Sequence, residues 1–355
     1  MMYDDVSCRS KTGILYLVVP CYNEEEALSD SAQKMKDKIL RLIDRGLISS
    51  KSKIMFVNDG SKDNTWKIIH SLCKEDTVYC GISFSRNYGH QSAILAGMMA
   101  ARDHADMIVT IDADLQQDIE ALDRFIKCYY EGCEIVYGVR NDRDTDGFFK
   151  KVSATLFYKF MKLLGCHVMA NHADYRLLSK KALEALAEYK EVNLFLRGLI
   201  PTMGFQSDVV YFDVKERELG KSKYTLKKMM TLAVDGVTSM STRPIQIITL
   251  LGFFVSLFSV IMIIYCIWDW FSGHNVPGYT TTLVVSLLMG GLTIFSLGIV
   301  GEYVGKIYLE AKARPRYIIE SFVWKESSSE ENKTIRERNQ TENTIGIGTE
   351  NEENV

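Results

Sequence analysis

The first 140 residues alternate between short apolar runs and longer segments in which apolar residues recur every three or four positions. The short runs are rich in β-branched and aromatic residues and predict strands at Ile14–Pro20, Lys53–Asp59, Val78–Ser85, Asp106–Asp114 and Cys133–Arg140. The longer segments predict helices at Glu24–Ile43, Asp63–Cys73, Gly89–Ala101 and Ile119–Tyr130. This alternation predicts an α/β, Rossmann-like domain with a mostly parallel sheet and helices on both faces.

The pattern becomes less regular after residue 140. Gly147–Gly165 has the composition of an amphipathic or membrane-grazing helix, and Asp174–Tyr189 predicts another helix. Val209–Lys215 predicts a strand. Ser222–Ser241 combines an apolar face with lysines, which favours an interfacial helix on the cytoplasmic leaflet.

Two long runs, Pro244–Trp268 and Tyr279–Gly301, contain no charged residue. The first charges after them are Asp269 and Glu302. Each run is longer than the roughly 20 residues that a helix needs to cross a bilayer, and we predict two transmembrane helices. The alternative is a pair of helices buried in a large soluble core, although such helices seldom run this long without a charge.

Basic residues flank the two runs and are absent from the connector between them. By the positive-inside rule, both termini and the α/β domain are cytoplasmic, and the protein is an integral membrane protein of the cytoplasmic membrane. The basic residues are Lys221, Lys223, Lys227, Lys228 and Arg243 before the runs, and Lys306, Lys312, Arg314 and Arg316 after them. The glycines of the second run and its end indicate close helix packing, within the chain or between the subunits of a homo-oligomer; they are Gly290, Gly291, Gly298, Gly301 and Gly305.

Composition narrows the possibilities further. The net charge of −3 comes without a basic face or a recognition motif, so we expect no nucleic-acid partner. The 8 cysteines include no C-x-x-C pair, which excludes the usual zinc and redox motifs and favours reduced core residues.

The polar clusters lie where the predicted parallel strands end. They are "CYNEEE", "NDGSKDN", "RNYGHQ" and "DADLQQD", each directly after a strand. In open α/β sheets, ligands bind beyond the carboxyl ends of the strands, so these loops predict one shared site. Asp112 and Asp114 form a D-x-D that suits Mg²⁺ or Mn²⁺ with a phosphate completing the shell. A bare D-x-D is more often a solvated turn, and the neighbouring loops favour the metal.

The stretches "VPCYNEEE", "FVNDGSKDNT", "FSRNYGHQSAILAGM" and "IDADLQQD", in this order and spacing, resemble the family 2 glycosyltransferases, which have the GT-A fold. The later "NHADYRLLS" and "KERELGKSKYTLKKM", followed by two spans, resemble its polyprenyl-phosphate glycosyltransferases, of the bactoprenol glucosyltransferase and dolichol-phosphate mannose synthase type. The resemblance covers about Ile14–Phe322. It implies a GT-A catalytic domain with amphipathic interface helices and two transmembrane helices.

With this resemblance, the chain divides into eight parts. They are an N-terminal segment (1–13), the cytoplasmic catalytic domain (14–221), an amphipathic juxtamembrane helix (222–243), transmembrane helix 1 (244–268), an extracytoplasmic connector (269–278), transmembrane helix 2 (279–303), a cytoplasmic C-terminal segment (304–324) and a disordered tail (325–355).

The resemblance also implies roles for single residues. The nucleotide-sugar residues would be Pro20, Tyr22, Glu24, Asn58, Asp59, Arg86 and Gln116, and the metal ligands Asp112 and Asp114. The family often has two aspartates where this chain has Asn58-Asp59, so a charge or metal role for Asn58 is in doubt. Two roles stay open for Arg86, contact with the diphosphate or support of its loop.

The same comparison implies catalytic roles for Asp112, Asp114, Asp174 and Arg217. Asp174 falls where the family has an acidic residue near the acceptor or sugar, with Arg176 as a partner; the alternative is an N-cap. Residues for the lipid phosphate would be Arg197, Lys221, Ser222, Lys223 and Tyr224. The basic segment among them serves substrate phosphates or anionic headgroups.

The activity implied is inverting, metal-dependent transfer of one hexose from a nucleotide sugar, with UDP-glucose or a related UDP-sugar favoured, to polyprenyl phosphate at the inner membrane face. A mannose synthase that uses GDP-mannose is one alternative, and a non-catalytic membrane scaffold is another. A processive polysaccharide synthase would have more spans and a Q-x-x-R-W motif, and this chain has neither.

Overall fold

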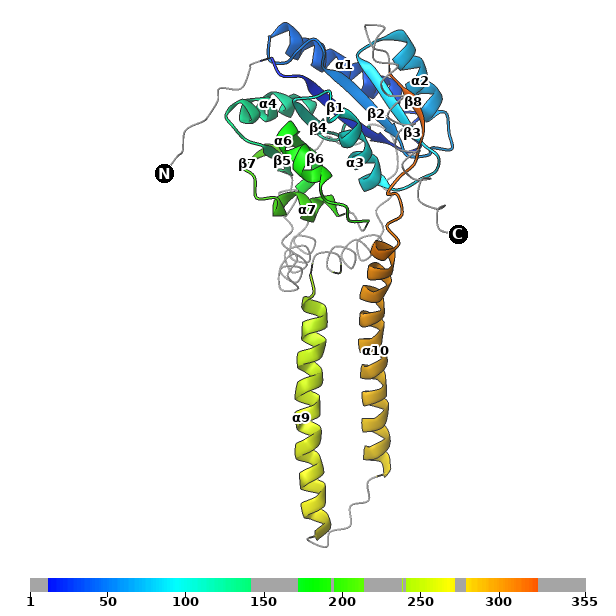
Figure 1. Ribbon diagram of the computed structural model, residues 1–355, viewed down its shortest axis with the longest axis vertical. Helices are drawn as coiled ribbons and strands as arrows, with labels where there is room; N and C mark the ends of the chain where they lie inside the picture. The colour runs from blue at the N-terminus through cyan, green and yellow to red at the C-terminus, as the bar shows by residue number, and fades with distance from the viewer. Residues whose placement is uncertain are drawn as a thin grey trace, which may run out of the picture.

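The computed structural model describes residues 12–141, 172–192, 195–213, 238, 241–271 and 279–324. Figure 1 shows an α/β domain from which two long helices extend in the same direction. The strands are β1 (Leu15–Cys21), β2 (Lys53–Asn58), β3 (Tyr79–Phe84), β4 (Met107–Thr110), β5 (Ile135–Arg140), β6 (His172–Ser179), β7 (Ser207–Phe212) and β8 (Ile319–Val323). The expected α/β class is confirmed.

The eight strands form one sheet in the order β7-β5-β6-β4-β1-β2-β3-β8. Its central strands β4, β1, β2 and β3 are parallel, as is the pair β5 and β7. β6 runs antiparallel to both β4 and β5, and β8 runs antiparallel to β3. The sheet is therefore mixed, and the expectation of a mostly parallel sheet holds for its central strands.

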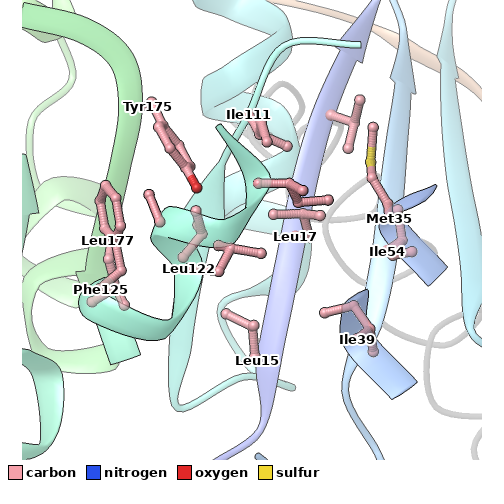
Figure 2. Packing of buried hydrophobic residues seen from close by; sticks show 14 of the residues in the cluster. Leu15, Leu17, Met35, Ile39, Ile54, Ile111, Leu122, Phe125, Tyr175 and Leu177 are labelled. Carbon is pink, nitrogen blue, oxygen red and sulfur yellow. The ribbon is translucent and has the colours of Figure 1, made fainter. Parts of the chain in front are cut away.

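Helices cover both faces of the sheet and bury its strands as continuous apolar runs. They are α1 (Leu28–Asp44), α2 (Thr65–Glu75), α3 (His90–Ala101), the 3₁₀ turn η1 (Ile119–Ala121), α4 (Leu122–Tyr130), α6 (Lys180–Ala187) and α7 (Leu196–Thr202). On one face, α1 and α4 pack Met35, Ile39 and Phe125 toward Leu15 and Leu17 of β1 (Figure 2). On the other face, residues of α3, α6 and α7 pack against the alternate side chains of the same strands.

The helix expected at Asp174–Tyr189 is wrong for its first half. His172–Ser179 forms β6, and α6 begins only at Lys180, where the Ser179 side chain accepts a hydrogen bond from the Ala182 amide. Asp174 is therefore not the N-cap of this helix. The segment is a strand because alternate residues serve opposite faces: Tyr175 and Leu177 enter one core and Leu178 the other.

The remaining differences are shifts of element ends. The expected strand Val209–Lys215 is β7 at Ser207–Phe212, and the expected helix Ile119–Tyr130 begins as η1 before α4. Cys21, Cys73, Cys80, Cys128 and Cys133 are buried free thiols, as expected for core cysteines. The expected helices Gly147–Gly165 and Ser222–Ser241 lie outside the described residues, apart from single positions at the end of the second.

The two long helices are α9 (Arg243–Phe271) and α10 (Tyr279–Ala311). Among the described residues, one stretch, Leu288–Ala311 of α10, is long and apolar enough to cross a membrane. α9 has 29 residues and exposes large side chains such as Phe253 and Phe258. By length and apolar composition, the structure thus supports one of the two expected transmembrane helices, α10.

The glycines of α10 have open space beside them in the described part of the chain. Apart from their own helix backbone and chain neighbours, no described atom lies within 4 Å of the position that a Cβ would take at Gly290, Gly291, Gly298, Gly301 or Gly305. Close helix packing at these glycines, including packing between subunits, stays a prediction.

The sequence gives no sign that the chain returns to the sheet after α10. Ile319–Val323 forms β8 at the β3 edge, and Tyr317 stacks on Phe84 with ring centroids 5.3 Å apart. Trp324 packs 5.8 Å from Tyr16 of β1. The C-terminal end of the helix pair is thereby tied to the α/β domain.

Gly60, in the loop after β2, generates a prediction about the fold. Its φ is +61°, and an added Cβ would lie 2.3 Å from the Arg86 carbonyl carbon. We expect Gly60→Ala to lower the free energy of unfolding by more than the roughly 1–2 kcal/mol of left-handed strain alone, because backbone atoms must move. Chemical unfolding of the purified protein in detergent measures this.

Gly46→Ala is the matched control. Gly46 has a φ of +66° but no atom within 4 Å of its Cβ position, so only the conformational strain applies. Equal losses in the two variants would contradict the steric argument.

Candidate active site

A cavity of about 800 Å³ opens at the carboxyl edge of the central strands. The loops after β1, β2, β3 and β4 all contribute to its wall, as the sequence predicts for one shared site. Its polar lining residues include Glu24, Asp59, His90, Asp112, Asp114, Gln116, Arg140, Asp174, Arg197 and Lys306. A volume of this size is typical of a small-molecule site.

The loop after β4 presents both members of the D-x-D to the cavity. The side chain of Gln117 holds Asp112 from two sides: its Nε2 donates to Asp112 Oδ2 at 2.6 Å, and its Oε1 accepts from the Asp112 amide at 2.7 Å. Asp114 Oδ1 accepts from the Gln116 amide at 3.2 Å. Ala113 between them is buried, so the two aspartates flank a fixed point of the loop.

A cluster of ion pairs anchors the far end of the same loop. Lys38 of α1 is 2% exposed and contacts both Glu120 and Asp123, with 2.5 Å between its Nζ and Glu120 Oε2. Arg41 and Arg45 bind the same two carboxylates from the surface. The loop is therefore held at both ends, by β4 and by α1.

The register of β6 brings Asp174 into the site. β4 pairs antiparallel with β6 so that Thr110 lies opposite Arg176. Two residues further along β4 is Asp112, and because the strands are antiparallel it lies level with Asp174, two residues before Arg176 in β6. The Thr110 hydroxyl donates to the Asp174 carbonyl at 2.5 Å and fixes this position.

Asp174 is 4% exposed and is held by two guanidinium groups. Arg176, which is itself fully buried, donates from Nη2 to Oδ1. Arg197 of α7 donates from Nε to Oδ1 at 3.1 Å and from Nη2 to Oδ2 at 2.8 Å. Burial opposes ionisation of Asp174, but the contact with His90 and the charges of Arg176 and Arg197 outweigh it and hold its pKa well below the usual range.

His90 lies between the two acidic positions, at the start of α3. Its Nε2 is 3.6 Å from Asp112 Oδ1 and 3.5 Å from Asp174 Oδ2. Burial alone would lower the pKa of His90, but Asp174 and Asp112 raise it. His90 therefore connects the D-x-D loop to the Asp174–Arg197 pair.

The donor set at the cavity fits a divalent cation. Burial raises the pKa of Asp112, and the charges of Asp174 and Asp114 raise it further against the effect of His90. A cation beside Asp112 and Asp114 would relieve this repulsion. No group of three or more His, Cys, Asp or Glu side chains with metal-binding geometry occurs within the described ranges.

Most of the expected nucleotide-sugar residues line the cavity. Pro20, Tyr22, Glu24 and Gln116 do so, and Asp59 lies at its wall. The Asp59 carboxylate accepts from the Tyr88 amide at 2.7 Å and the Gly89 amide at 3.0 Å, which orients the loop that leads to His90. Burial raises the pKa of Asp59 against these two hydrogen bonds.

Two expected residues face away from the cavity lining. Asn58 is buried, donates to Ser83 Oγ at 2.8 Å and accepts from the Ser61 amide at 3.2 Å. Arg86 lies over the Tyr88 ring, 3.9 Å from its centroid, and donates to the Asn87 carbonyl. These contacts favour the loop-supporting alternative for Arg86.

The basic segment with Arg217, Lys221, Ser222, Lys223 and Tyr224 lies outside the described residues. Arg197, expected at the lipid phosphate, lines the cavity and binds Asp174.

Three residues in the site were missed by the sequence reasoning. Gln117 immediately follows the proposed contributor Gln116, His90 stands in the "RNYGHQ" cluster, and Arg140 ends β5. β5 and β4 are both antiparallel to β6, so Arg140 obeys the same strand-end rule that found the other loops. That signal was present in the sequence. The neighbouring glutamine could be assigned only from its contacts.

Comparison with known proteins agrees with this arrangement of an α/β domain and a helical hairpin. Residues 16–187 match the glycosyl transferase family 2 domain, and residues 243–307 match the GtrB C-terminal hairpin. The uncharacterized glycosyltransferase YkoT of Bacillus subtilis (strain 168) is 43% identical over 92% of this chain and 96% of its own. The bactoprenol glucosyl transferase of Shigella phage SfX is 39% identical over 86% of this chain and 98% of its own.

A cavity at the carboxyl edge of an α/β sheet is typical of a ligand-binding site, and the relatives make the class of protein specific. The chain belongs to the family 2 glycosyltransferases that carry a GtrB C-terminal hairpin, and it is a glycosyltransferase.

The buried pair Asp174–Arg176 generates a prediction about stability. We expect Asp174→Asn to lower the free energy of unfolding by about 3–5 kcal/mol at pH 7, because Arg176 keeps its buried charge without a counter-ion. Adding Arg176→Met should recover part of this loss without restoring turnover. Unfolding in detergent and turnover of the same samples measure the two effects.

The pH dependence follows from the lowered pKa of Asp174. Its stabilising effect is present above its unfolded-state pKa of about 3.9 and is lost as pH falls through the folded-state pKa. The gap between wild type and Asp174→Asn should therefore narrow in acid, and it should also decrease as pH rises through the raised pKa of His90, because the charge of His90 that Asp174 stabilises is then lost. Asp103→Asn, which breaks an exposed pair with Arg102, should cost under about 1 kcal/mol. A gap that does not narrow in acid would contradict the assignment.

Proposed function

We propose that this glycosyltransferase transfers a single hexose from a nucleotide sugar, UDP-glucose or a related UDP-sugar, to polyprenyl phosphate on the cytoplasmic membrane face. The product would be a lipid-linked sugar for modification of cell-surface glycans. The observation that carries the proposal is the pair Asp112 and Asp114 on a cavity large enough for a nucleotide sugar. The relative from phage SfX, named a bactoprenol glucosyl transferase, aligns over almost its whole length and supports the acceptor and the sugar.

A divalent cation, Mg²⁺ or Mn²⁺, would be held by Asp112 and Asp114, with Gln117 fixing the first of them. Bound there, it would stabilise the negative charge that develops on the departing nucleoside diphosphate. Arg140, which also lines the cavity, adds positive charge on the same side.

Asp174 serves as an orienting group in this proposal. Its carboxylate is ionised and bonded to two arginines, so it is a weak base and its place is fixed. The acceptor needs little help from a base, since a phosphate monoester has a second pKa of about 6 and is largely dianionic at neutral pH. Direct attack of its oxygen on the sugar C1 inverts the configuration without a glycosyl-enzyme.

One alternative function uses a different nucleotide-sugar donor, and the other is not enzymatic. A GDP-mannose donor would fit the same carboxylate pair, so the choice between UDP and GDP rests on the named relatives. A non-catalytic scaffold would not need Gln117, His90 and Arg197 arranged around two cavity carboxylates. A subunit contact through the glycine face of α10 is a further expectation of this proposal.

Alanine substitution of either acid tests the proposed function. We expect Asp112→Ala and Asp114→Ala to reduce turnover by at least about 100-fold while the protein remains folded, and EDTA to have the same effect on the wild type. The assay is release of nucleoside diphosphate from a panel of UDP- and GDP-sugars, with and without a short polyprenyl phosphate.

Asp118→Asn is the matched control, because Asp118 lies in the same loop outside the cavity lining and caps η1 through the Glu120 amide. An asparagine caps equally well, so its turnover should stay near that of the wild type. Full activity of both alanine variants, or turnover independent of the lipid, would refute the proposal.

The proposed topology has both termini in the cytoplasm and two spans. We expect Asn275→Cys, in the connector, to react with a membrane-impermeant maleimide on intact cells, whereas Lys312→Cys should react only after the membrane is opened. The parent chain gives the background labelling. Labelling of both positions in intact cells, or of neither, would contradict two spans.

A further inference from the structure

One cation in the cavity wall comes from the membrane hairpin. Lys306 belongs to α10, yet it lines the same cavity as Asp112, Asp114 and Arg197. We propose that Lys306 binds the phosphate of the lipid acceptor and so completes the active site from the membrane side. This inference rests on the proposed function and names a residue of that same site.

A single face of α10 is directed at the catalytic domain. Tyr303, Lys306 and Glu310 are half-buried, whereas their neighbours Val304, Ile307 and Leu309 are exposed. Residues three and four apart lie on one side of a helix, so these three form one stripe. This stripe marks where the helix leaves the membrane and meets the domain.

Each member of the stripe is fixed by a hydrogen bond. The Tyr303 hydroxyl donates to the Ser241 carbonyl at 2.6 Å, and Lys306 Nζ donates to Thr238 Oγ1 at 2.5 Å. Glu310 Oε2 accepts from the Val192 amide at 2.9 Å, in the segment that leads to α7. The position of Lys306 at the cavity is therefore set by bonds on both sides of it along the helix.

The charges in the cavity are divided in a way that suits two phosphate groups. Arg197 is bound to Asp174, and Arg140 acts electrostatically on Asp112; among the described residues, Lys306 is a cation that α10 contributes to the wall. An ammonium has three N–H donors, so its bond to Thr238 is compatible with contact to a phosphate oxygen.

The location also matches the lipid. Lys306 lies five residues before the end of the apolar stretch Leu288–Ala311, about 8 Å along the helix axis. A prenyl chain in the bilayer carries its phosphate at the headgroup level, where a lysine near a helix end reaches the interface. The acceptor phosphate would thus enter the cavity beside α10.

Kinetics of Lys306→Gln and Lys306→Arg in neutral detergent, with no anionic lipid, tests the inference. We expect Lys306→Gln to lower kcat/KM for a short polyprenyl phosphate by at least about tenfold, mainly through KM, because a charge-assisted hydrogen bond is lost. The KM for the nucleotide sugar should change less than about twofold. Lys306→Arg should recover most of the activity, which a purely structural role would not require.

Lys312→Gln is the matched control. Lys312 follows α10, is exposed over the Tyr308 ring and does not line the cavity, so its kinetics should match the wild type. Equal losses in the two glutamine variants would overturn the inference in favour of general attraction between basic residues and the acceptor. A rise in the donor KM instead of the acceptor KM would overturn it in favour of the donor diphosphate.

The experiments distinguish a failure of the proposed function from a failure of the role proposed for Lys306. A wild-type protein that turns over without polyprenyl phosphate would refute the proposed function and the inference with it. A wild-type protein that depends on the lipid, together with an unchanged Lys306→Gln, would overturn the inference alone.

Discussion

The site depends on the hydrogen bonds and ion pairs that the carboxylate of Asp174 makes. This carboxylate is buried at the end of β6, and it draws Arg176 from its own strand, Arg197 from α7 and His90 from α3 to one point. A buried carboxylate needs such partners, because its desolvation penalty would otherwise exceed any gain from folding around it. The same need fixes three separate elements around the cavity.

This constraint explains why part of the site was predictable from the sequence and part was not. Asp112, Asp114 and Glu24 follow strands that are evident from their apolar runs, and the strand-end rule places them together. Asp174 lines the cavity, as the sequence led us to expect, but the helix predicted for it is wrong, because "HADYRLLS" has leucines that fit a helix and an aspartate that fits a cap. Only the pairing of β6 with β4 shows that it lies level with Asp112.

The pairing of β8 with β3 could not be predicted from the sequence either. β8 is a short strand after α10, and nothing in its length or composition identifies the β3 edge as its partner. Its pairing returns the chain to the sheet that carries the active-site loops. Together with the bond from Val192 to Glu310, it connects the hairpin to the α/β domain.

The surroundings of two cavity carboxylates shift their pKa values in opposite directions. Burial and two acidic neighbours raise the pKa of Asp112, whereas two arginines and a histidine hold that of Asp174 well below its usual range. A group with a raised pKa gains most from a cation, and a group already paired gains least. In the proposed mechanism, the ion and the leaving diphosphate would lie at Asp112 and Asp114, and Asp174 would position the cationic side chains. An acceptor that is already an anion suits this division, since the site then needs positive charge at two places and no strong base at either.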